Sequence, residues 1–147
     1  MKKVYVNEER CLGCHLCEFY CGFAHSGKES MEKAYNCDHP PVARIQIEEG
    51  DAVNFAVSCR HCETPLCVKS CITGALSKNA DGVVTVDENR CIGCFTCILS
   101  CPYGSIVPDG NKPVKKCDLC IQSGGEPACA AACPNRAIVF EERGEMK

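Results

Sequence analysis

The chain contains 147 residues, the length of one compact domain, and carries a formal net charge of −3. Its 17 cysteines are about 12% of all residues, whereas it has only 5 Phe, 4 Tyr and no Trp. A core made of organic side chains alone would be thin at this composition. We therefore expect groups bound by the thiols to fill part of the interior.

Composition and sequence also exclude several classes of protein. The acidic charge balance leaves no basic surface for nucleic acid, and no run approaches the roughly 18 apolar residues of a membrane span. Asn7, Glu8 and Glu9 interrupt the first residues before the apolar region of a signal peptide could form. We therefore expect a cytoplasmic protein, in which a high and odd number of cysteines favours metal sites over disulfides.

Short strands separated by polar turns are predicted along the chain, at residues 4–6, 42–47, 53–57, 83–86 and 137–140. Apolar and polar residues alternate on both sides of a turn at 48–51, which predicts a hairpin, and residues 79–82 predict a second turn. The polar segment 22–41 is predicted to be a surface excursion. No linker rich in Pro, Ser or Gly divides the chain.

Sixteen of the cysteines form four groups of four, which we call quartets. The first and third have the spacing C-x2-C-x2-C-x3-C, whereas the middle gap is four residues in the second and eight in the fourth. In chain order the quartets are Cys11, Cys14, Cys17 and Cys21; Cys59, Cys62, Cys67 and Cys71; Cys91, Cys94, Cys97 and Cys101; and Cys117, Cys120, Cys129 and Cys133. Cys37 belongs to no quartet, and we expect it to be an unpaired thiol in a surface loop.

The spacing C-x2-C-x2-C-x3-C is the one that bacterial ferredoxins use to bind [4Fe-4S] clusters. Three closely spaced cysteines offer thiolates to three irons of one cluster, and the fourth cysteine, one helical turn further on, ligates the neighbouring cluster. Quartets should therefore work in pairs, and four quartets complete four clusters. A structural or regulatory zinc module is the alternative, but zinc sites pair two C-x2-C units and do not need this spacing.

Internal repeats predict a duplicated fold. Residues 7–14 and 87–94 share one pattern, NEERCLGC and DENRCIGC, at an offset of 80 residues. Leu76, Ile106 and Ile138 each lie five residues after the last cysteine of a quartet, which predicts a one-turn helix carrying that cysteine and then a short strand. We therefore predict a small α+β fold, a duplicated ferredoxin-like unit of the bacterial two-cluster type, in a single domain that covers residues 1–147.

The order and gaps of the quartets resemble those of the four-cluster iron–sulfur subunits of molybdenum and tungsten oxidoreductases and of carbon monoxide dehydrogenase systems. The segments that favour the carbon monoxide dehydrogenase group are RHCETPLC at 60–67, CITGA at 71–75, KCDLC at 116–120 and PAC at 127–129. The electron-transfer subunit of tungsten aldehyde oxidoreductases is similar as well. The resemblance covers nearly the whole sequence.

In that family the quartets pair in a nested way, the first with the fourth and the second with the third. The resemblance implies four ligand sets, numbered one to four: Cys11, Cys14, Cys17 and Cys133; Cys21, Cys117, Cys120 and Cys129; Cys59, Cys62, Cys67 and Cys101; and Cys71, Cys91, Cys94 and Cys97. Each set would hold a [4Fe-4S] cluster. The pairing also implies two lobes, one formed by residues 1–41 with 108–147 and the other by residues 42–107.

The expected function is electron transfer without catalysis. Clusters held in a row by one scaffold pass single electrons between neighbours, and the sequence contains no P-loop, dinucleotide-binding motif or catalytic triad. The resemblance implies a catalytic oxidoreductase subunit as one partner, with carbon monoxide dehydrogenase as the first choice and a tungsten aldehyde oxidoreductase as the second. A soluble electron acceptor or flavoprotein would be the other partner.

Charged and imidazole side chains adjoin several of the cysteines. Five basic residues lie beside first ligands and could raise cluster potentials, although we expect solvated surface charge for each of them: Arg10, Arg60, Arg90, Lys115 and Lys116. His15 and His61 are expected to donate N–H groups to cluster sulfur or to lie on the surface.

Overall fold

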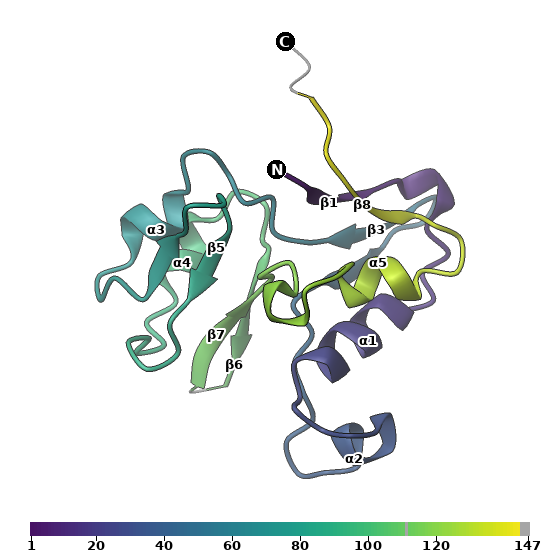
Figure 1. Cartoon of the computed structure of the whole chain (residues 1–147), viewed down its shortest axis with the longest axis horizontal. Helices are drawn as coiled ribbons and strands as arrows, with labels where there is room; N and C mark the ends of the chain where they lie inside the picture. The colour runs from purple at the N-terminus through teal and green to yellow at the C-terminus, as the bar shows by residue number, and fades with distance from the viewer. Residues whose placement is uncertain (111, 145–147) are drawn as a thin grey trace.

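Four two-stranded antiparallel sheets and a set of short helices make up the computed structural model, which describes residues 1–110 and 112–144 (Figure 1). In chain order the elements are β1 (Lys3–Val6), η1 (Glu8–Arg10), α1 (Leu16–Ala24), α2 (Met31–Tyr35), β2 (Gln46–Glu49), β3 (Asn54–Val57), α3 (Leu66–Ser70), β4 (Leu76–Lys78), β5 (Val84–Val86), α4 (Thr96–Ser100), β6 (Ile106–Asp109), β7 (Lys112–Lys116), η2 (Ile121–Ser123), α5 (Ala128–Ala132) and β8 (Ile138–Glu141). Within these described ranges, no helix has the length and apolar character needed to span a membrane.

The sheets pair β1 with β8, β2 with β3, β4 with β5 and β6 with β7. The predicted hairpin is present, because Gln46 lies opposite Val57 and Gly50 N–H donates to the Val53 carbonyl at 2.9 Å. The predicted strand 42–47 is wrong in its position, since β2 begins only at Gln46. The preceding residues run beside α1 instead, where Arg44 N–H donates to Cys21 Sγ at 3.3 Å rather than to a strand.

The segment 22–41 contains more structure than a surface excursion. It holds the end of α1 and all of α2, whose start is capped by the Ser30 hydroxyl accepting from Lys33 N–H at 3.3 Å. Tyr35 ties α2 to α1, because its hydroxyl donates to the Phe19 carbonyl at 2.6 Å and its ring meets the Phe19 ring edge-on at 5.2 Å between centroids. Ala34 of α2 is buried as well.

Two lobes are visible in Figure 1, and each is built around a pair of packed helices. In the first lobe α1 packs against α5, beside the β1–β8 and β2–β3 sheets. In the second lobe α3 packs against α4, beside β4–β5 and β6–β7. Each lobe has its own core, and cysteine side chains are a large part of both.

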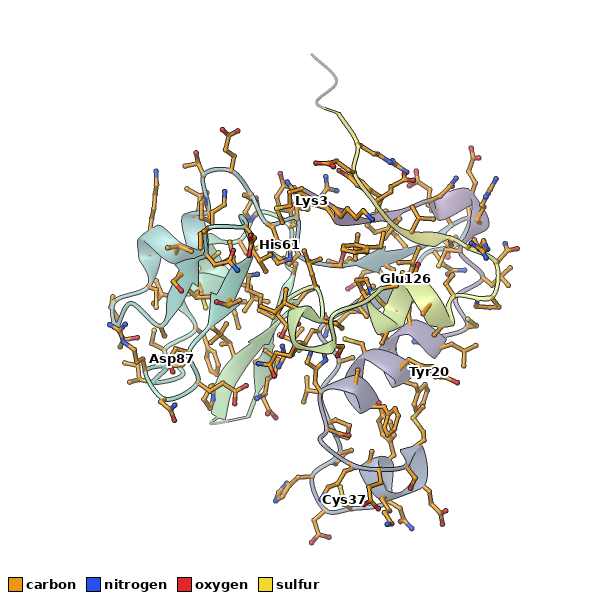
Figure 2. All side chains as sticks on the ribbon, viewed as in Figure 1. Lys3, Tyr20, Cys37, His61, Asp87 and Glu126 are labelled. Atoms are coloured by element: carbon orange, nitrogen blue, oxygen red, sulfur yellow. The ribbon has the colours of Figure 1, made fainter. Side chains whose placement is uncertain are left out.

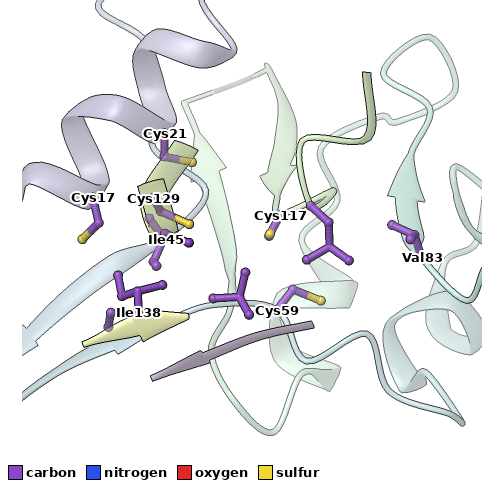
Figure 3. Packing of buried hydrophobic residues seen from close by; sticks show 12 residues of the cluster. Cys17, Cys21, Ile45, Cys59, Val83, Cys117, Cys129 and Ile138 are labelled. Carbon is purple, nitrogen blue, oxygen red and sulfur yellow. The ribbon is translucent and has the colours of Figure 1, made fainter. Parts of the chain in front are cut away.

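The cores divide the chain differently from the predicted ranges 1–41 with 108–147 and 42–107. Ile45 and Ala56, from the β2–β3 segment, are buried with Cys17 and Cys129 in the core of the first lobe (Figure 3). Val114 of β7 is buried in the core of the second lobe. The reason is local pairing, because each hairpin keeps its two strands together and carries both into one core.

We expect Ile45→Ala to destabilise the first lobe, because Ile45 is only 1% exposed and the smaller side chain would leave a cavity among apolar neighbours. The free energy of unfolding should fall by about 2–5 kcal/mol, measured by anaerobic guanidinium titration of the cluster-loaded protein. Val53→Ala in the same hairpin is the control. Since Val53 is 53% exposed, its replacement should change stability by about 0.5 kcal/mol or less, and equal losses in both variants would contradict this packing.

Candidate metal centres

The four quartets share one backbone bend. The residue directly before the second cysteine has a positive φ in every quartet: Gly13 (66°), His61 (45°), Gly93 (69°) and Leu119 (58°). Glycine adopts this conformation freely, whereas a positive φ is uncommon for His and Leu. Because the chain keeps the bend even where no glycine is available, the bend is needed to curl each loop so that its cysteines converge.

Short helices position the later cysteines of each quartet. The third cysteine lies on α1, α3, α4 or α5, and in three quartets the fourth is the C-cap residue in an extended conformation. The predicted one-turn helix is therefore present in these quartets, but it carries the third cysteine and ends just before the fourth. A left-handed residue then turns the chain into the next strand: Gly74 (63°), Gly104 (62°) and Arg136 (48°).

Helix packing brings particular quartets together. Because α1 packs against α5, the first quartet lies beside the fourth, and because α3 packs against α4, the second lies beside the third. Each lobe therefore collects the cysteines of two quartets that are distant in sequence.

Two cavities are each lined by four cysteines from two quartets. One is lined by Cys11, Cys14, Cys17 and Cys133 together with apolar side chains that include Ile47 and Ile138. The other is lined by Cys71, Cys91, Cys94 and Cys97 together with Leu76, Val86 and Val114. These cysteines are those of ligand sets one and four.

The cysteines of the other two ligand sets interact electrostatically. Burial raises the pKa of Cys129, and the neighbouring Cys117, Cys21, Cys120 and Cys17 raise it further. The first three of these neighbours belong to ligand set two with Cys129, and Cys17 belongs to ligand set one. Burial also raises the pKa of Cys67, and the nearby Cys59 and Cys101, both of ligand set three, act in the same direction.

Burial disfavours the ionisation of several of these thiols when no metal is bound. It is the largest cause that raises the pKa of Cys17 and Cys117 to about 12 and that of Cys97 to about 11. A bound cation reverses this preference, because thiolates are the metal ligands and metal binding releases their protons. These buried cysteines are therefore suited to a group that brings positive charge into the interior.

Backbone N–H groups donate to some of the sulfur atoms, and hydroxyl groups lie within hydrogen-bond distance of others. The N–H donors are Arg44 to Cys21 at 3.3 Å, His61 to Cys59 at 3.3 Å and Ala137 to Cys133 at 3.2 Å. The hydroxyl neighbours are Thr73 at 3.7 Å from Cys71, Thr96 at 3.4 Å from Cys94 and Ser105 at 3.4 Å from Cys101. Such hydrogen bonds favour the thiolate, and the Thr96 hydroxyl is the largest cause that lowers the pKa of Cys94.

His61 offers a test of whether a sulfur-rich group fits the site. Its side chain is 1% exposed, and Nδ1 accepts the Val84 N–H at 3.0 Å, so that Nε2 carries the ring proton. That N–H has no hydrogen-bond partner among the residues that the structure describes. Burial and nearby lysines lower the pKa of His61 to about 3, which keeps the ring neutral. A buried donor without an acceptor, two residues from Cys59, suits a cluster whose sulfur atoms accept hydrogen bonds.

The other residues singled out beside the cysteines lie in different surroundings. His15 is at the surface, where its ring nitrogens meet Glu18 at 2.6 Å and Glu49 at 2.7 Å. The guanidinium of Arg60 stacks over the ring of Tyr103 at 4.5 Å.

Lys115 and Lys116 differ although they are adjacent. Lys115 reaches outward to pair with Glu88 at 2.6 Å. Lys116 is only 3% exposed, so the expectation of solvated surface charge is wrong for this residue.

A partly buried ion network next to ligand set two was missed in the sequence. Asp118 accepts from Arg44 at 2.7 Å and from His25 Nε2 at 3.0 Å, while His25 Nδ1 donates to the Cys21 carbonyl at 2.8 Å. Burial opposes a charge on His25, but hydrogen bonds with Asp118, Cys120 and Cys21 outweigh it and raise its pKa to about 12.

A sequence signal for His25 did exist. It lies four residues after Cys21, the last cysteine of its quartet. Ser105 and Ala137, which lie at the same offset from Cys101 and Cys133, both contact the sulfur of that cysteine.

Cys37 lies apart from the quartets, in the loop after α2 (Figure 2). It is exposed, and its thiol donates to the Ala34 carbonyl at 3.3 Å. The structure therefore gives it no role in any of the ligand sets.

Comparison with known proteins identifies relatives over most of the sequence. An "Iron-sulfur protein" of Rhodospirillum rubrum is 41% identical, covering 92% of this chain and 79% of that protein. One polypeptide of the anaerobic dimethyl sulfoxide reductase of Haemophilus influenzae is 36% identical, covering 97% of this chain and 75% of that polypeptide. "Electron transport protein HydN" of Escherichia coli is 32% identical, covering 98% and 90% respectively.

A solved structure and a family model agree with this similarity. One polypeptide of the "Active site complex BamBC of Benzoyl Coenzyme A reductase in complex with Zinc" matches the whole of this chain and 82% of its own length, with a TM-score of 0.50. At 21% identity this likeness concerns the fold alone. The family described as "4Fe-4S dicluster domain" matches residues 51–143. The chain therefore belongs to the 4Fe-4S dicluster family of iron–sulfur proteins.

Proposed function

We propose that this protein is a non-catalytic electron-transfer subunit, which relays single electrons between a catalytic oxidoreductase subunit and a redox acceptor. The observation that carries the proposal is the grouping of cysteines, since two cavities are each lined by four of them and α1–α5 and α3–α4 bring the quartets together in pairs. Family membership adds the [4Fe-4S] chemistry. The names of two relatives, a polypeptide of a dimethyl sulfoxide reductase and an electron transport protein, support the role.

We further propose that the chain holds four clusters on the nested ligand sets. The cysteines that line two cavities match ligand sets one and four, and the effects of Cys117, Cys21 and Cys120 on the pKa of Cys129 support ligand set two. Each bound cluster would supply a one-electron couple. The role of the chain's own residues is to supply thiolates, to donate N–H groups to sulfur and to exclude water from the buried sites.

The four sites would form a row across the two lobes. Ligand sets one and two lie in the first lobe, and ligand sets three and four lie mainly in the second. Cys117 of set two and Cys59 of set three lie in one core and interact electrostatically, which supports adjacent inner sites at the junction (Figure 3). Sites one and four would then be the ends at which electrons enter and leave.

For the catalytic partner, carbon monoxide dehydrogenase remains the first proposal and a tungsten aldehyde oxidoreductase the second. Both rest on the resemblance of the segments 60–67, 71–75 and 116–120, since the relatives reported above name neither enzyme. We also propose a cytoplasmic location and a soluble acceptor or flavoprotein as the other partner. Anaerobic co-purification from native extract tests the partner directly: recovery of an enzyme of another class would contradict both choices.

Iron and acid-labile sulfide in the anaerobically purified protein should each approach about sixteen per chain, because four complete cubane clusters contain that number. The measurement is chemical analysis with a parallel zinc determination. The protein should also be brown and lose its colour in air. About eight irons per chain would contradict four clusters, and a colourless zinc protein would contradict the function itself.

Cys133→Ala should perturb the same cluster as Cys14→Ala, because both residues line one cavity and belong to ligand set one. Potentiometric EPR spectroscopy of the two variants should show the loss or conversion of the same one of the four signals. Cys94→Ala, which alters ligand set four, serves as the comparison and should affect a different signal. A match between Cys133→Ala and Cys94→Ala would establish another pairing.

A further inference from the structure

The junction between the lobes contains a buried lysine. Lys116 is 3% exposed and is the last residue of β7, directly before Cys117 of ligand set two. Its ammonium group donates to the Val84 carbonyl at 2.8 Å and to the Cys117 carbonyl at 3.1 Å, and no carboxylate pairs with it among the salt bridges of the described residues. Burying an unpaired ammonium is unfavourable unless negative charge lies nearby.

Hydrogen bonds connect this lysine to ligand set three as well. His61 N–H donates to Cys59 Sγ at 3.3 Å, and His61 Nδ1 accepts the Val84 N–H at 3.0 Å. The Val84 carbonyl then accepts from Lys116, which also donates to Cys117. A continuous path of four hydrogen bonds thus runs from a cysteine of ligand set three to a cysteine of ligand set two.

Positive charges act on His61 at the junction, with Asp118 as an opposing negative charge. His61 lies between the two lobes near Lys3 (Figure 2), and after burial the charges of Lys116 and Lys3 are the largest causes that lower its pKa. Through its hydrogen bonds with the Val84 and Cys117 carbonyls, Lys116 contacts both a cysteine of ligand set two and the strand that is bonded to His61, beside Cys59 of ligand set three. This lysine is therefore connected to both inner ligand sets.

We propose that Lys116 is a positioning residue that raises the reduction potentials of the two inner clusters together and so stabilises an electron at the junction between the lobes. Reduction adds one negative charge to a cluster, and a fixed positive charge nearby stabilises that state. The buried ammonium does this for sets two and three at once, because it lies between them. The cysteines of ligand sets one and four line two cavities, and Lys116 lines neither of them.

The test is potentiometric EPR spectroscopy of the cluster-loaded Lys116→Gln protein. Glutamine keeps N–H donors for the two carbonyls but removes the charge. Two of the four midpoint potentials should shift to lower values, and the other two should stay unchanged. In the Lys116→Arg protein, which keeps the positive charge, all four potentials should stay at the values of the unaltered protein. Lys115→Gln is the matched control, because it removes the same charge one residue away on the side that faces Glu88. It should leave all four potentials unchanged.

The inference rests on the proposed function, so the cluster content of the unaltered protein is measured first. Fewer than four clusters would contradict the proposed function, whereas four clusters whose potentials do not move in Lys116→Gln would overturn only the inference. An equal shift in Lys115→Gln would overturn it too. If Lys116→Gln loses two clusters that Lys116→Arg retains, the charge is required for the inner sites and the inference is supported. Loss of the two clusters in both variants would overturn the inference, because the inner sites would then require the shape of the lysine side chain and not its charge.

Discussion

The structure depends on keeping thiolate sulfur stable inside a small protein. An ionised thiol is costly to bury, and burial alone raises the pKa of several of these cysteines far above the ordinary value. Metal binding and N–H groups directed at sulfur offset that cost. The left-handed bends before each second cysteine, the short helices and the paired helices α1–α5 and α3–α4 all serve to converge cysteines around shared centres. Because apolar side chains are few, these centres replace much of an ordinary core.

The parts of the fold that depend on nearby residues could be predicted from the sequence. The quartets, the hairpin with its turn at 48–51 and the strands that begin at Leu76, Ile106 and Ile138 are all local features. The parts that failed depend on distant residues. Residues 42–45 have the composition of a strand, but the segment beside them is α1, so Arg44 donates to a sulfur instead. The assignment of each hairpin to a lobe likewise depends on packing that no local pattern encodes.

Lys115 and Lys116 show the same limit within the site. They are adjacent in the sequence, and solvated charge is a reasonable expectation for both. In β7, however, side chains alternate between faces, so Lys116 follows the buried Val114 inward while Lys115 turns outward to Glu88. In a strand that starts with Val114 facing the core, every second side chain faces the core, so Lys116 would be placed inside. The strand is not predicted from the sequence, because Pro113 and three lysines are untypical of a strand. The network of His25, Arg44 and Asp118 was missed because its members are far apart in the sequence.

The two lobes repeat one motif, but their junction has no counterpart within either lobe. An oxidised [4Fe-4S] core with four thiolates carries a net charge of about −2, so two such sites at adjacent positions repel one another. Within a lobe, helix packing holds the sites together against that repulsion. At the junction Cys59 and Cys117, from quartets that pair in different lobes, lie in one core, and there the chain places the neutral ring of His61 and the buried ammonium of Lys116. In the proposed arrangement, a positive charge between two negative sites would offset their repulsion, and Lys116, which is bonded to Val84 and Cys117, would also set the potential at which an electron crosses the junction.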